Sequence, residues 1–142
     1  MRGRPLLTLL LIIACLSQAA RADIAVVVHP ESPLRQLSPQ EVSDLYLGRV
    51  RSIQGSERLL VLDQPRDSEL RSRFFQLLNG MSLRSVNAYW ARLQFSGVSQ
   101  PPIPLPDSQA VIKIVHHNRL AIGYVEAPAV TGDVRTLLTL KE

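Results

Sequence analysis

The part of the sequence best suited to chemistry is residues 62–75, LDQPRDSELRSRFF, where a short apolar run gives way to a helical pattern. Five polar side chains in it make up a candidate ligand site: Gln64, Arg66, Asp67, Ser68 and Arg71. The start of a helix offers unpaired N–H groups and about half a positive charge, which together favour an anion. Ser68, Arg66 and Arg71 would add hydrogen bonds, so the segment predicts small-anion binding.

The same residues also suit a capped surface helix with no ligand. In that interpretation Asp67 or Ser68 is the N-cap, and Arg66 and Arg73 are solvated or pair with acids. Glu69 lies in the first helical turn, where its carboxylate complements the helix dipole. It would also repel a phosphate about 5 Å away by about 3 kcal/mol per unit charge at an effective dielectric of about 20. Both interpretations of the segment stay open.

Other chemistry has weaker support in the sequence. Ser68 lacks the Gly-x-Ser-x-Gly turn of a hydrolase nucleophile. Adjacent helical residues such as His116 and His117 point about 100° apart, so they do not share a metal easily. Adding His29 and Asp63 gives no recognised ligand spacing. We therefore expect a protein that is not an enzyme and has neither a metal nor a cofactor.

Residues 1–22 predict a secretory signal peptide. Arg2 and Arg4 precede an apolar run at 6–16, and Ala20-Arg21-Ala22 supplies small residues for cleavage before Asp23. The run is about half of the roughly 20 residues that a bilayer-spanning helix needs. Lipid attachment at Cys15 is the less favoured alternative. A periplasmic location follows for residues 23–142, which are long enough for one domain.

Removal of this segment changes the charge balance of the chain. The full sequence has 16 basic and 12 acidic side chains, and Arg2, Arg4 and Arg21 leave with the signal peptide, so the net charge of the rest is +1. No nucleic acid is therefore expected as a partner. Cys15, the only cysteine, leaves as well unless it carries a lipid.

The rest of the chain alternates predicted strands and helices. Strands are expected at 23–28, 59–62, 120–125 and 134–138, and helices at 39–47, 68–78, 83–95 and 108–117. Ser38, Ser82 and Asp107 are the expected N-caps of three helices, and residues 99–107 form a proline-rich loop. This order predicts an α/β fold with a mixed or mainly parallel sheet flanked by helices.

Four segments together resemble the phosphate-binding-protein family of ABC transporters. They are AVVV.P..PL..LS..EV.DLYLGR from residue 25, VLDQP..S.LR..FF from 61, YWARL.F.G from 89, and AIGYV from 121. The resemblance implies a single lobe, half of a type II periplasmic binding protein. It also implies phosphate or a related small anion as the ligand, and an inner-membrane transporter or sensor as the partner.

Only part of the family's anion-binding loop has matching residues in this chain. Ser68 matches the central serine, whereas the family's basic position falls on Gln64 and its Gly-Thr pair on Glu69 and Leu70. Arg66 is two positions from the family arginine, and Arg71 resembles an arginine of short relatives. Two hypotheses follow: anion binding linked to phosphate transport, or an interaction or sensory-adaptor module that keeps the fold without tight anion binding.

Overall fold

The structure is a computed structural model that describes residues 21–142. The predicted signal peptide and Cys15 therefore lie outside the described residues, except for Arg21 and Ala22. None of the helices within residues 21–142 is long and apolar enough to cross a membrane.

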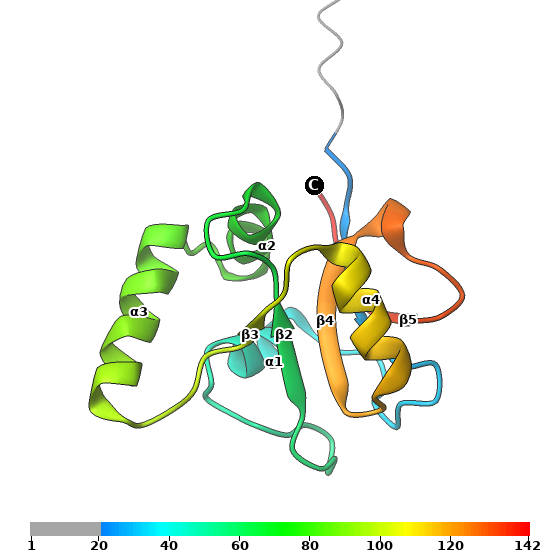
Figure 1. The fold of residues 1–142 in the computed structure, drawn as a ribbon, viewed down its shortest axis with the longest axis horizontal. Coiled ribbons are helices and arrows are strands. Elements are labelled where there is room, and N and C mark those ends of the chain that lie inside the picture. The colour runs from blue at the N-terminus through cyan, green and yellow to red at the C-terminus, as the bar shows by residue number, and fades with distance from the viewer. Residues whose placement is uncertain (1–20) are drawn as a thin grey trace, which may run out of the picture.

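A five-stranded mixed sheet forms the centre of the fold (Figure 1). Its strands are β1 (Ile24–Val28), β2 (Leu60–Asp63), β3 (Ile103–Pro104), β4 (Ala121–Glu126) and β5 (Arg135–Leu140). They lie in the order β3-β2-β4-β1-β5. β2 is parallel to β3 and β4, whereas β1 is antiparallel to β4 and β5. The predicted mixed α/β sheet is confirmed, but β3 lies where only a proline-rich loop was expected.

Four α-helices and one short 3-10 helix complete the fold. They are α1 (Pro39–Tyr46), α2 (Glu69–Asn79), α3 (Leu83–Ser96), α4 (Ser108–His117) and the 3-10 turn Ala127–Ala129. Ser38, Ser68, Ser82 and Asp107 cap the four helices in chain order. The predicted caps are confirmed, and Ser68 rather than Asp67 caps α2.

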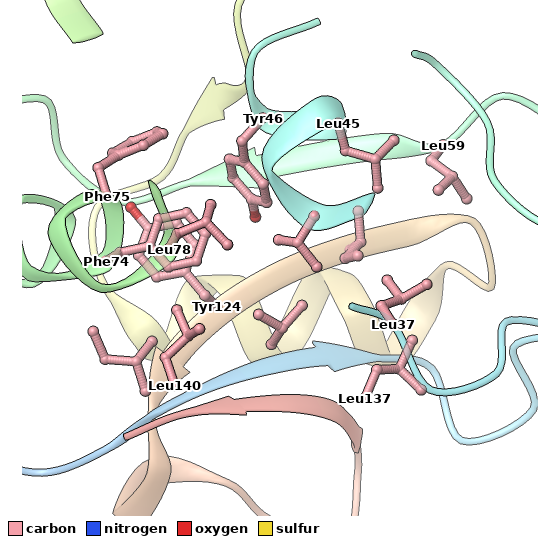
Figure 2. Packing of buried hydrophobic residues seen from close by; sticks show 14 of the residues in the cluster. Leu37, Leu45, Tyr46, Leu59, Phe74, Phe75, Leu78, Tyr124, Leu137 and Leu140 are labelled. Atoms are coloured by element: carbon pink, nitrogen blue, oxygen red, sulfur yellow. The ribbon is translucent and has the colours of Figure 1, made fainter. Parts of the chain in front are cut away.

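Both faces of the sheet are covered, as the continuous apolar run of β1 predicts. All five residues of β1 are buried, and they alternate between two apolar clusters. α1, α2 and α3 pack into one cluster, and α4 packs into the other. In the larger cluster the rings of Phe74 and Tyr124 stack at 3.6 Å between centroids, with Tyr46 edge-on to both (Figure 2).

The buried face of α2 is wider than its apolar residues predict. Those residues favour Leu70, Phe74, Leu77 and Leu78 as the core face; Phe74 and Leu78 are buried, and Leu70 and Leu77 are partly buried against the same cluster. Arg71, Arg73 and Phe75 are buried as well. Residues 71, 74, 75 and 78 have the i, i+3, i+4, i+7 spacing of one helix face, so Arg71, expected as an anion contact, lies on a buried face.

Arg73 connects α2 to both ends of the described chain. Its guanidinium donates to the carboxylates of Glu126 at 3.4 Å and Glu142 at 3.2 Å, and to the carbonyl oxygen of Ala22. The side chain is only 9% exposed, so these acids offset a buried charge. This network fixes α2 against the sheet and thereby positions the residues at its start.

Candidate functional site

The candidate site is built around a buried ion pair at the end of β2. Alternation along the strand places Val61 in the cluster under α1 and α2 and Leu62 in the cluster under α4, so Asp63 faces the α1/α2 side. There Asp63 Oδ2 accepts a hydrogen bond from Arg71 Nε at 2.9 Å. Asp63 is 4% exposed and Arg71 is 5% exposed. The carboxylate therefore offsets the arginine charge inside the protein.

The second carboxylate oxygen of Asp63 is also occupied. Tyr124 donates its hydroxyl proton to Asp63 Oδ1 at 2.5 Å, and the backbone N–H of Gln64 donates to the same atom at 2.8 Å. Burial raises the pKa of Tyr124 well above its usual value, and the charge of Asp63 raises it further. Tyr124 is therefore a neutral donor at physiological pH, and neither oxygen of Asp63 is left without a partner.

The side chain of Gln64 makes hydrogen bonds within the fold. Its Nε2 donates to the carbonyl oxygen of Tyr124 at 2.9 Å and to Ser108 Oγ at 3.1 Å. The residue is 2% exposed. Gln64 thus connects the end of β2 to β4 and to the start of α4, and both of its amide protons have protein acceptors.

The other predicted residues lie on or near the turn before α2. Ser68 Oγ accepts from the backbone N–H of Arg71 at 3.2 Å, as an N-cap does. Asp67 is exposed and, like Ser68, does not line the cavity that borders Arg71. Glu69 is exposed in the first turn of the helix. Of the five predicted site residues, Gln64, Arg66 and Arg71 border this cavity, but both side-chain amide protons of Gln64 already have protein acceptors.

Arg71 retains donor capacity despite its burial. A guanidinium has five N–H donors. One at Nε bonds Asp63, and Nη1 donates to the carbonyl oxygen of Arg66 and to Asn87 Oδ1, both at 2.8 Å. Within residues 21–142 no hydrogen bond from Nη2 to a protein acceptor is found, so two donors of Arg71 remain available.

The cavity beside Arg71 has a volume of about 160 Å³ and lies among β2, the start of α2, α3 and the segment that leads into β3. Figure 1 shows α3 set apart from the sheet, with that segment returning from its end to β3. Asn87, Trp90, Ala91 and Gln94 line the cavity from one face of α3, at i, i+3, i+4 and i+7. The remaining wall consists of Pro101, Pro102 and Pro104.

Asn87 of α3 adds a donor to those of Arg71. Asn87 Oδ1 already accepts from Arg71, so the group that Asn87 can still offer is its Nδ2 amide. Together with Arg71 Nη2 this amide gives the cavity a set of hydrogen-bond donors. Trp90 lines the same cavity and is 4% exposed; its indole N–H is buried and has no acceptor among the described residues.

The sequence does not mark Asn87 as a site residue, and the helical pattern at 83–95 favours Tyr89 or Trp90 for the core over a ligand contact. The spacing of Arg71 with Phe74, Phe75 and Leu78 was the available signal, because it places an arginine on a buried face that needs an acidic partner. No comparable signal marks Asn87, whose role depends on how α3 docks beside α2.

The other candidate residues remain apart from this cavity. Arg49 and Arg51 form a small basic segment after α1: Arg49 Nη1 lies 3.3 Å from Asp44 Oδ1, and Arg51 is exposed. The rings of His29 and His116 stack at 6.3 Å between centroids. Within residues 21–142 no group of three or more histidine, cysteine or acidic side chains is placed to hold a metal ion.

Comparison with solved structures finds several binding proteins with the same fold over part of their length. A Clostridium perfringens protein, described as a phosphate ABC transporter substrate-binding protein and solved with bound phosphate, matches with a TM-score of 0.65 at 18% identity. An ABC-type phosphate transport receptor from Vibrio cholerae matches with a TM-score of 0.64 at 17% identity. PstS from Borrelia burgdorferi matches with a TM-score of 0.60 at 11% identity. No protein-family model and no curated protein sequence matches the chain.

The extent of these matches supports a partial relationship in fold. Each covers 82% of this chain but only 44%, 45% and 46% of the three solved proteins in turn. The chain thus spans less than half the length of the proteins whose fold it shares. The predicted likeness to half of a periplasmic binding protein is confirmed at the level of fold.

Proposed function

We propose that this chain, which has the fold of about half of a phosphate-type substrate-binding protein, is an exported binding module that takes a small anion in the cavity beside Arg71. Residues 1–22 would be removed on export to the periplasm. An ABC-type phosphate transporter in the inner membrane would be its partner, and phosphate or a related small anion its ligand.

The donor set of the cavity carries this proposal. Arg71 Nη2 and Asn87 Nδ2 have no protein acceptors among the described residues, while both oxygens of Asp63 and the oxygen of Asn87 are occupied. A ligand in contact with these groups must accept hydrogen bonds. Arg66 borders the same cavity and adds a positive charge. Hydrogen bonds from charged donors contribute about 1.5–3 kcal/mol each.

A second candidate, an interaction module without tight anion binding, is favoured by a different observation. Phe95 is 98% exposed and Val98 is 65% exposed, both at the end of α3. The family resemblance places Ser68 and Gln64 at the ligand. Here Ser68 caps α2, and the side chain of Gln64 donates to Tyr124 and Ser108. In this alternative the end of α3 contacts a membrane sensor or transporter, and the cavity holds only water.

Isothermal titration of the purified exported protein with phosphate and with sulfate distinguishes the two. Anion binding predicts measurable heat, and Arg66→Gln weakens the affinity about tenfold or more because a charged hydrogen bond is lost. Arg92→Gln is the matched control, since Arg92 is an exposed arginine of α3 that does not line the cavity. If neither of these anions nor a small carboxylate such as acetate gives heat at millimolar concentrations, the interaction module is supported instead.

A further inference from the structure

The cavity beside Arg71 offers donors on some walls and none on another. Arg71 and Asn87 present N–H groups from α2 and α3. Pro101, Pro102 and Pro104 form the wall contributed by the segment around β3, and proline has no backbone N–H. This wall can contact an apolar group, but its backbone cannot hydrogen-bond an oxyanion.

The side chains that line the cavity also carry only a small net charge. The charged side chains that line it are Asp63, Arg66 and Arg71, and the first of these offsets the third through the 2.9 Å ion pair. Arg66 therefore supplies the one net positive charge. A phosphate group carries a charge of about −1.5 to −2 at pH 7, whereas a carboxylate carries one negative charge. The balance at the cavity favours a monoanion.

The separation of donor walls from the proline wall also indicates the shape of the ligand. Phosphate directs four oxygens tetrahedrally, so part of it would face the prolines without a donor. A carboxylate presents both oxygens at one end and leaves the other end apolar. We infer that the cavity binds a short-chain organic monocarboxylate, whose oxygens meet Arg71 and Asn87 while its hydrocarbon part contacts the prolines. This inference rests on the proposed anion-binding function and narrows its ligand class.

The cavity, with a volume of about 160 Å³, has room for a ligand of a few carbon atoms.

A ligand series tests this inference with Trp90, the only tryptophan of the chain, as a fluorescence reporter. The purified exported protein is titrated with acetate, propionate, butyrate, butyramide and inorganic phosphate at constant ionic strength. We expect each added methylene to tighten binding about threefold to fourfold, because a buried methylene contributes about 0.8 kcal/mol. Butyramide, which lacks the charge, should bind at least tenfold more weakly than butyrate.

The outcomes separate the inference from the function on which it rests. If phosphate binds and butyrate binds no more tightly than acetate, or more weakly than phosphate, the monocarboxylate assignment is wrong and anion binding stands. If neither phosphate nor any carboxylate binds, the monocarboxylate inference and the proposed anion binding are both wrong.

One variant tests whether the carboxylate of the ligand binds beside Asn87. Asn87→Asp keeps an oxygen that accepts from Arg71 but replaces the amide donor with a negative charge, so butyrate affinity should fall at least tenfold. An unchanged urea midpoint confirms that the variant is folded, and Arg92→Gln should bind butyrate like the parent protein. Unchanged butyrate affinity in folded Asn87→Asp would overturn the assignment.

Discussion

Arg71 Nε donates to Asp63 Oδ2 at 2.9 Å inside the protein, where the two residues are 5% and 4% exposed. The resemblance to anion-binding proteins suggested Arg71 as a ligand contact, and the structure gives it a prior partner. Asp63 offsets the charge of Arg71, and only the two N–H groups of Nη2 remain available to a ligand. Arg71 therefore offers hydrogen bonds from a position fixed by the fold, and not an unpaired positive charge.

Removal of one partner of this pair should be costly. We expect Asp63→Asn to lower the free energy of unfolding by about 3–5 kcal/mol, because the buried charge of Arg71 loses its compensation. Urea unfolding followed by circular dichroism measures this loss. In the double variant Asp63→Asn with Arg71→Met the loss should be smaller than the sum of the two single losses, because the residues are in contact. Additive losses would show that the ion pair is not a coupled unit.

Alkaline pH should destabilise the fold through its buried tyrosines. Burial, followed by the charge of Asp63, raises the pKa of Tyr46 and of Tyr124 well above the usual value. The folded state then keeps protons that the unfolded state loses above about pH 10, so stability is full below that pH and falls as pH rises. Each tyrosine should lower the free energy of unfolding by about 1.4 kcal/mol per pH unit in that range.

Phenylalanine variants isolate this effect from the titration of other groups. Tyr46→Phe and Tyr124→Phe should each reduce the slope of stability against pH above pH 10, measured by urea unfolding at several pH values. Tyr124→Phe should also cost about 1.5–3 kcal/mol at pH 7, because Asp63 loses a hydrogen bond. An unchanged alkaline slope in both variants would contradict the assignment.

Gly48 should tolerate alanine worse than Gly80 does. Both have positive φ, +67° and +73°, so alanine at either position costs about 1–2 kcal/mol. A Cβ at Gly48 would also lie 2.7 Å from Trp90 Cη2 and 2.9 Å from Ser99 Oγ, whereas one at Gly80 meets open space. We expect Gly48→Ala to lose at least about 1 kcal/mol more and to shift Trp90 fluorescence. Equal losses would show that Trp90 moves aside at no cost.

Much of the fold could be predicted because it is determined by local chemistry. Ser38 and Glu41 form a reciprocal capping box, so the start of α1 is evident in four residues. The β-branched run of β1 predicted cover on both faces. β3 could not be predicted, because two residues in a proline-rich segment become a strand only through pairing of Leu62 with Ile103.

The candidate site was predictable only in part. Its place at the start of α2 follows from the sequence, which leaves Asp67 and Ser68 as alternative caps, and the structure selects Ser68. The pairing of Arg71 with Asp63 joins a helix to a strand and depends on which face of each is buried. Asn87 and Trp90 reach the cavity only because α3 lies beside α2, and no short-range pattern encodes that placement.

The most direct test of the account observes the indole N–H of Trp90 by nuclear magnetic resonance during an anion titration. As the only tryptophan, Trp90 gives a single indole signal. The account predicts a saturable shift with phosphate or butyrate, because Trp90 lines the cavity that the anion enters, and loss of that shift in Asn87→Asp. An indole signal that stays in place, or that moves equally with chloride at the same ionic strength, would contradict anion binding in this cavity.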